Sequence, residues 1–275
     1  MIDFLNRIAG AFVGGFTRAV GALSPQLVLM LHALAIAGLV VAVYKLVSDQ
    51  RRIRRRKNRM IARLLEIRIF QSDPVAVIGS FRRVIVEVIA YVAASAKPLL
   101  ILVPVIILWI AQLAVWFEWR PLAPGESAVV SISLKPGISP IAQPALLETP
   151  DGIAVETPAF RSLATNEVSW RIRAVHAGQG ALRCTAAAFT AQKDVVAGAA
   201  LEKVSPKKVG VAFWSRVLWP AEESLGKDAP FSEIRIAYPQ RSLRFFGREV
   251  NWLVALLIAS FALALVVKRP FRVEF

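Results

Sequence analysis

Histidine and cysteine are almost absent from this sequence of 275 residues, which contains 2 histidines and 1 cysteine. A single cysteine, Cys184, excludes an intrachain disulfide, and its position in a predicted strand indicates a small buried hydrophobe. The two histidines, His32 and His176, are not accompanied by clustered ligand residues, so the sequence predicts no metal site.

Motifs for nucleotide, redox or metalloprotease chemistry are also missing, since no CxxC, HExxH, P-loop or GxGxxG pattern occurs. Among paired carboxylates, Asp151 and Glu156 flank a predicted turn, and Glu222–Glu223 are expected on an exposed helix. We therefore predict no catalytic residues, no cofactor and no enzyme activity. A membrane enzyme that uses His32 or His176 is the weaker alternative.

Acidic residues are few compared with basic ones, 19 against 34, which gives a net charge of +15. Hydrophobic residues make up 56% of the chain, above the ~45–50% that is usual for soluble domains. This surplus predicts segments that are embedded in a membrane.

Three apolar runs, 27–47, 99–117 and 252–267, approach the ~20 residues that cross a bilayer. The third is short, because its 16 residues span only about 24 Å at ~1.5 Å per residue. Aromatic residues at the ends of the second and third runs fit an aromatic belt at one membrane face: Trp116, Phe117 and Trp252.

Orientation follows from the distribution of lysine and arginine, which favour the cytoplasmic side. The segment 45–97 holds 13 basic and 4 acidic residues, and the tail 268–275 is basic. The long segment 118–251 is nearly balanced, with 16 basic and 13 acidic residues. We therefore predict a multi-pass protein of the bacterial inner membrane with its N-terminus outside and its C-terminus in the cytoplasm.

The predicted fold class is a mixed α+β membrane protein with three transmembrane helices, a cytoplasmic helical hairpin and an extracytoplasmic β-sandwich-like domain. The expected parts are an interfacial amphipathic helix (1–24), the first transmembrane helix (25–48), the basic hairpin (49–97), the second transmembrane helix (98–117), the β-domain (118–210), a membrane-proximal connector (211–250), the third transmembrane helix (251–267) and a tail (268–275).

The N-terminal segment has apolar residues at helical spacing, among them Leu5, Ile8 and Phe12, which predicts an amphipathic helix in the membrane interface. A signal peptide is the alternative. An acidic residue, Asp3, and an arginine within the apolar run, Arg7, argue against it.

The hairpin is predicted from two helical patterns. The first has a heptad-like stripe of Ile53, Met60, Leu64 and Ile67. The second, roughly 74–96, begins with Asp73 as N-cap and Pro74 at the first helical position, and Lys97–Pro98 separates it from the second span. Its apolar residues at helical spacing are Val77, Phe81, Val84, Val88, Tyr91 and Val92.

The basic patch of the hairpin consists of Arg51, Arg52, Arg54, Arg55, Arg56, Lys57 and Arg59. Three interpretations stay open: a topology signal on a solvated helix face, contact with anionic lipids, and contact with RNA or a ribosome. No aromatic residue interleaves this run to stack on bases, which disfavours the third.

The β-domain is predicted from alternating patterns, clearest where Val168, Trp170 and Ile172 alternate with polar residues. About six strands within 128–209 are expected, with a hairpin around 150–152 and a turn at 178–180. A short amphipathic helix is expected within 211–225, where Trp214 and Trp219 suit an interface: VAFWSRVLWPAEESL.

Polar residues inside the predicted spans are costly there and are candidates for function or for helix packing. They are His32, Lys45 and Gln112. Lys45, near the cytoplasmic end, can also extend its amine to the interface.

The order of these parts resembles the core of the YidC/Get-type membrane protein insertases. The stretch YKLVSDQRRIRRRKNRMIARLLEIRIFQSDP, followed by KPLLILVPVIILWI, is similar to the archaeal YidC-like branch. The resemblance implies a polar groove, with Lys45 and Gln112 as groove groups, His32 as a further candidate, and the run 51–59 as the hairpin group. It also implies partners, namely membrane lipids, client membrane proteins and a ribosome or nascent chain, but no DNA. The alternative is a scaffold or sensor subunit whose β-domain binds an extracytoplasmic partner.

Overall fold

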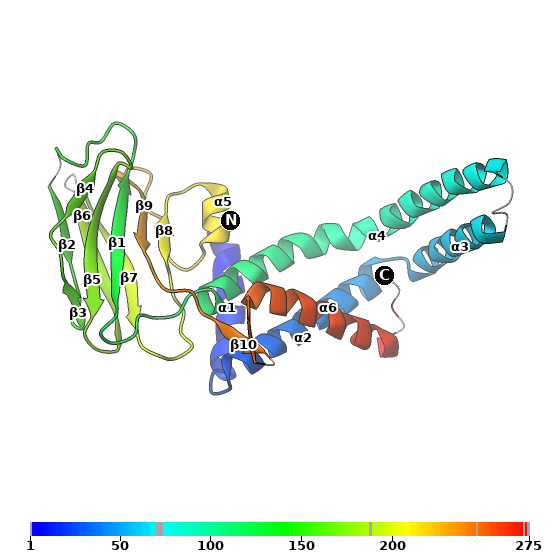
Figure 1. Cartoon of the computed structure of the whole chain (residues 1–275), viewed down its shortest axis with the longest axis horizontal. Helices are drawn as coiled ribbons and strands as arrows, with labels where there is room; N and C mark the ends of the chain where they lie inside the picture. The colour runs from blue at the N-terminus through cyan, green and yellow to red at the C-terminus, as the bar shows by residue number, and fades with distance from the viewer. Residues whose placement is uncertain are drawn as a thin grey trace. The chain divides into compact units, whose positions relative to one another are not determined.

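The computed structural model of the chain describes residues 2–69, 74–142, 144–186, 189–245, 247–271 and 273. It combines helices with β-sheets, which confirms the predicted α+β class (Figure 1). The chain divides into two compact units, Met1–Val28 with Leu108–Trp252, and Leu29–Ile107 with Leu253–Phe275. We describe each unit by itself.

The long helices are α1 (Ile2–Ala19), α2 (Pro25–Val47), α3 (Gln50–Ile69), α4 (Pro74–Phe117) and α6 (Trp252–Phe271). Three stretches are long and apolar enough to cross a membrane: Pro25–Val47, Ala96–Phe117 and Trp252–Phe271. The described part of the chain therefore contains the three candidate spans that the sequence predicts.

The helix ends differ from the prediction in two places. Helix α4 continues through Pro98 and Pro104 for 44 residues, so Lys97–Pro98 does not separate the hairpin from the second span. A proline removes one backbone hydrogen bond, and apolar helices tolerate this loss without ending. Helix α6 has 20 residues and includes the basic Lys268 and Arg269, so it is longer than its apolar run. The predicted N-cap, Asp73, lies outside the described residues.

The larger sheet has the strand order β3-β5-β1-β9-β8, and β4 also pairs with β5. Its strands are β1 (Ser127–Leu134), β3 (Ile153–Val155), β4 (Phe160–Ser162), β5 (Glu167–Ala174), β8 (Lys207–Val209) and β9 (Phe231–Ile236). All of these pairs are antiparallel. In β5, Val168, Trp170 and Ile172 are buried, which confirms the predicted alternation.

The second sheet has the order β2-β6-β7, from β2 (Ala145–Glu148), β6 (Gly178–Ala186) and β7 (Phe189–Ala197). Both sheets contribute buried residues to one hydrophobic core, in which Ile132 and Ile172 of the larger sheet meet Leu182 and Cys184 of the smaller. Residues of the two sheets therefore belong to a single hydrophobic core.

Strand β9 lies between β1 and β8, so the β-domain includes residues beyond the predicted limit of 210. Its sequence, FSEIRI, places Phe231, Ile234 and Ile236 in the core. The predicted hairpin around 150–152 is wrong, because β2 pairs with β6 while β3 pairs with β5. The turn itself exists, with Gly152 at a φ of 86°, but it carries the chain from one sheet to the other.

The predicted turn at 178–180 is also wrong, since Gly178–Ala186 is a strand whose first residues pair with the end of β7. Two glycines around a polar residue are typical of a turn. In this strand, however, the absence of a side chain at Gly180 lets Pro150 pack against the backbone. A Cβ on Gly180 would lie 2.6 Å from the Pro150 ring.

The segment that enters the β-domain and the segment that leaves it are joined by backbone hydrogen bonds. Arg120 N–H donates to Pro239 O at 3.0 Å, and Arg241 N–H donates to Glu118 O at 2.9 Å. At the helix ends, the rings of Phe117 and Trp252 stack with centroids 6.5 Å apart. Both side chains are buried, as is that of Trp116, so these aromatics pack within the protein instead of facing outward as a belt. A small two-stranded sheet, β10 (Leu243–Phe245) with β11 (Arg248–Val250), precedes α6.

Candidate functional site

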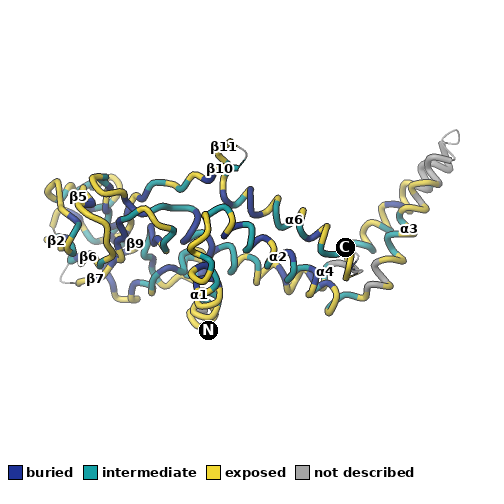
Figure 2. The backbone as a smooth tube through the Cα atoms, turned by 90° about the horizontal axis from the view of Figure 1, so that it is seen from below, coloured by how far each residue is buried: buried dark blue, intermediate teal, exposed yellow. Residues whose placement is uncertain are grey.

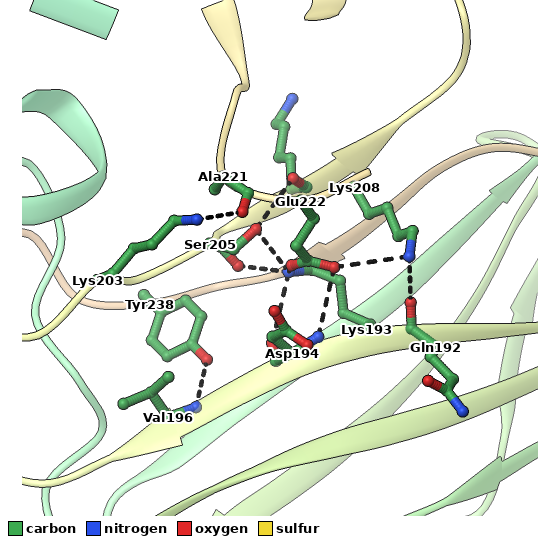
Figure 3. A network of polar contacts seen from close by, with 11 residues as sticks. Gln192, Lys193, Asp194, Val196, Lys203, Ser205, Lys208, Ala221, Glu222 and Tyr238 are labelled. Carbon is green, nitrogen blue, oxygen red and sulfur yellow. Dashed lines mark hydrogen bonds and ion pairs between the residues drawn. The ribbon is translucent and has the colours of Figure 1, made fainter. Parts of the chain in front are cut away.

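A buried ion pair joins β7 to the segment that follows α5 (Phe213–Leu218). Figure 3 shows the Lys193 ammonium between the Glu222 carboxylate and Ser205, where it donates to Glu222 Oε1, to Ser205 O and to Ser205 Oγ. The other carboxylate oxygen of Glu222 accepts the Asp194 N–H at 3.4 Å and lies 3.9 Å from Lys208 Nζ. The ammonium and the carboxylate therefore neutralise each other's charge in a buried environment.

Burial shifts the pKa values of Lys193 and of the nearby Cys184. It lowers the pKa of Lys193, while the Glu222 carboxylate opposes that shift. Burial also raises the pKa of the Cys184 thiol to about 12. Cys184 is thus a buried, unreactive thiol, which confirms its interpretation as a core hydrophobe.

The prediction for Glu222 is wrong, because the residue lies outside any helix and its side chain is almost fully buried. Helix α5 ends at Leu218, since Pro220 follows and cannot supply a backbone N–H. Glu223 does have an exposed side chain. Sequence reasoning missed Lys193 as well, because an isolated lysine within an alternating strand carries no local sign of its partner.

A polar cavity of about 490 Å³ lies between α1, the C-terminal end of α4 and the segment around α5. Its lining includes Asp3, Arg7, Arg18, Gln112, Trp116, Lys203, Arg216, Glu222 and Glu223. Three of these charged side chains are carboxylates and four are cations, so the cavity carries a small positive excess.

Most of these charges are paired. Arg216 Nη1 lies 2.9 Å from Asp3 Oδ2, and Arg7 Nη2 lies 2.9 Å from Glu223 Oε1. Lys203 Nζ donates to Ala221 O. Burial and the nearby Arg18 both lower the pKa of Lys203, because each disfavours its charged form.

Of the three predicted groove residues, Gln112 lies at this cavity. It is buried, and its Nε2 donates to Asn6 O of α1 at 3.2 Å. His32 is buried within α2, while Lys45 is exposed near its end, with Nζ 5.2 Å from the centroid of the Phe271 ring. Neither is among the described residues that line the cavity.

The basic patch lies on α3, as predicted. Arg51, Arg54, Arg55 and Arg59 are exposed, and Arg56 and Lys57 are partly buried. Arg56 Nη1 lies 3.1 Å from Glu87 Oε2 of α4, which joins the two helices of the hairpin. The side chain of Arg52 lies outside the described part.

The apolar stripes of the hairpin are less buried than their spacing predicts. On α3, Leu64 is exposed and Met60 is partly buried, while the side chains of Ile53 and Ile67 lie outside the described part. On α4, Val84 is buried, but Phe81, Val88 and Val92 are exposed, and the side chain of Val77 is likewise outside it. The first half of α4 is apolar on nearly all sides, and α3 alone can cover only one of them.

Within the described part of the chain, no group of three or more His, Cys, Asp or Glu residues could hold a metal ion. Comparison with known proteins gives no further assignment. No protein-family model matches the chain, and neither a curated protein nor a solved structure shows significant similarity to it.

Proposed function

We propose that this chain is a YidC-like protein of the bacterial inner membrane that binds apolar helices of other membrane proteins and assists their insertion or assembly. One observation carries the proposal: the first half of α4 exposes an apolar row, Phe81, Ile85, Ile89 and Val92, at helical spacing. The 44 residues of α4 extend about 66 Å at ~1.5 Å per residue, roughly twice the ~30 Å of a hydrocarbon core.

The candidate span occupies only Ala96–Phe117, so the apolar row lies on helix that a straight span would leave outside the hydrocarbon. Large exposed apolar surfaces in water mark interaction sites for apolar partners. A hydrophobic helix in transit to the membrane is a partner of matching chemistry.

The basic face of α3 supports the same proposal. Arg51, Arg55 and Arg59 follow each other at four-residue intervals and are exposed, so they form one cationic row. Such a row attracts anionic lipid head groups, at about 1 kcal/mol per basic residue near the surface. A ribosome or nascent chain is a further partner that we propose for this row, and DNA is not.

The charge distribution supports an orientation with the hairpin and the C-terminus in the cytoplasm and the β-domain outside. In this arrangement His32 and Lys45 remain proposed client-groove residues. The side chain of Gln112 is already engaged with Asn6 O, so we propose that it holds α1 against α4.

The test is insertion of a short apolar client helix into proteoliposomes that contain the full-length protein, measured by protease protection. The triple variant Phe81→Asn, Ile85→Asn, Ile89→Asn should lower insertion several-fold, because the exposed row loses its affinity for the client. The matched control replaces three exposed apolar residues of the β-domain, Ile141→Asn, Leu146→Asn and Phe160→Asn, and should leave insertion unchanged.

A scaffold or sensor subunit is the second candidate. It is favoured by the apolar side chains that the β-domain exposes at Ile141, Leu146, Phe160 and Leu163. Arg161 holds this region together, because its Nη1 donates to Pro140 O and to Ile141 O, both at 3.2 Å. The scaffold function would replace the insertase function under two conditions. Both triple variants would support normal client insertion, and the β-domain triple variant would lose a stable complex that the unchanged protein forms.

A further inference from the structure

Helix α1 has two faces of opposite character. One face lines the polar cavity, with Gly10 and Gly14 close to Gln112 and Trp116. The other exposes Phe4, Leu5, Ile8 and Phe12. Figure 2 shows much of α1 in the colour of exposed residues. Exposure of such side chains to water is unfavourable, so this face favours an apolar environment.

Helix α5 is short but exposes large apolar side chains as well. Phe213, Trp214 and Leu218 are exposed, whereas Val217 points into the protein and is buried. The rings of Phe213 and Trp214 meet edge to face, with centroids 5.2 Å apart. A tryptophan on an exposed apolar turn suits the boundary between lipid and water.

Polar contacts fix α5 to the first turns of α1, although about 200 residues separate them in sequence. Arg216 Nη1 pairs with Asp3 Oδ2 at 2.9 Å, and Asn6 Nδ2 donates to Arg216 O at 2.9 Å. The pair Arg7–Glu223, at 2.9 Å, also joins α1 to the segment that follows α5. The exposed apolar side chains of α1 and α5 therefore belong to elements that contact each other directly.

The apolar face of α1 ends against a candidate span. The ring of Phe12 packs edge-on against Trp109 of α4, with centroids 5.4 Å apart. Trp109 lies within Ala96–Phe117, which is apolar enough to be surrounded by hydrocarbon. The face is thus continuous with a surface that lipid would cover, which identifies lipid as its occupant.

We propose that α1 and α5 form one composite lipid-binding surface, whose apolar side chains enter the interfacial layer of the leaflet nearest the β-domain. The ion pair between Asp3 and Arg216 couples the two helices. This surface holds the β-domain against the membrane, and its existence does not depend on the proposed client-binding function.

The test uses the full-length protein in phosphatidylcholine nanodiscs that contain a trace of lipid with a nitroxide near the top of one acyl chain. Single cysteines replace Ile8, Trp214 or Leu146 in a Cys184→Ala background and carry an environment-sensitive fluorophore. The three positions are similarly exposed, at 52%, 65% and 57%. Leu146, on the outer strand β2, is the control.

The proposal expects strong quenching at positions 8 and 214 and none at 146. Quenching at 214 no greater than at 146 would overturn it, whatever position 8 shows. Labels on both α1 and α5 that stay unquenched would exclude lipid as the occupant altogether.

The coupling has its own test at position 214. Asp3→Arg should lower quenching there at least two-fold, because it sets two cations against each other. The double variant Asp3→Arg, Arg216→Asp should restore it by recreating the pair with reversed polarity. Equal quenching in the parent, single and double variants would show that α5 enters lipid without α1 and would overturn the coupling.

Discussion

The Lys193 ammonium and the Glu222 carboxylate form an ion pair that water does not reach, since their side chains are 0% and 5% exposed. The pair ties a strand of the smaller sheet to the segment after α5, which also lines the polar cavity (Figure 3). One buried interaction therefore connects the β-domain core to the part of the chain that contacts α1.

Breaking this pair on one side should be costly. Glu222→Gln leaves the Lys193 ammonium buried among neutral acceptors, Ser205 and Asp194 O, with no opposing charge among the described residues in contact with it, and removal of one member of a buried pair costs about 3–5 kcal/mol. We expect a matching loss in the free energy of unfolding, measured by thermal or denaturant unfolding of the full-length protein in nanodiscs. The neighbouring Glu223→Gln, which removes an exposed pair with Arg7, should cost less than about 1 kcal/mol. Equal losses for the two variants would contradict the buried pair.

The thiol of Cys184 should make the β-domain less stable at high pH. Its pKa is about 12 in the folded chain against an ordinary value of 9.0. Between these values the unfolded chain has lost the proton that the folded chain retains, so stability falls as pH rises from 9 towards 12. The loss is at most about 4 kcal/mol, from 1.36 kcal/mol for each pKa unit. Cys184→Ala should remove this part of the pH dependence of Tm between pH 8 and 11. A parallel decline in both proteins would contradict the assignment.

The pair between Arg56 and Glu87 should stabilise the hairpin. Arg56→Glu places two carboxylates together and should destabilise the contact between α3 and α4 by about 1 kcal/mol, the upper range for a partly exposed pair. Hydrogen exchange of α3 amides in nanodiscs should rise accordingly. The double variant Arg56→Glu, Glu87→Arg should restore protection. Arg59→Glu, at an exposed position, is the matched charge control.

Two glycines of α1 should respond differently to alanine. A Cβ added at Gly15 would have no atom within 4 Å, so Gly15→Ala should simply favour the helix, by about 0.5–1 kcal/mol. At Gly10 the added Cβ would lie 3.2 Å from Gln112 Oε1, so part of that gain is lost in displacing the amide. Hydrogen exchange of α1 should slow by roughly two- to five-fold for Gly15→Ala and by less for Gly10→Ala. Equal slowing would show that Gln112 does not constrain α1.

The amino-acid sequence by itself determined the regions that avoid water. The three apolar runs required helices long enough to span a bilayer, and the alternation at Val168, Trp170 and Ile172 required a strand buried on one face. These are local signals, because hydrophobic period and length act within one element. The buried state of Cys184 follows from its position in a predicted strand of its own, β6.

Only the tertiary structure decided which distant elements meet. Nothing in the sequence around Pro150 indicates that the turn there leads the chain from one sheet to the other. Nothing around Phe231 indicates that β9 pairs between β1 and β8. The pairing of Lys193 with Glu222 is equally non-local, as is the bond from Gln112 to Asn6. Strand order and buried charge pairs depend on contacts between residues far apart in the chain, and local propensity and periodicity carry no information about such contacts.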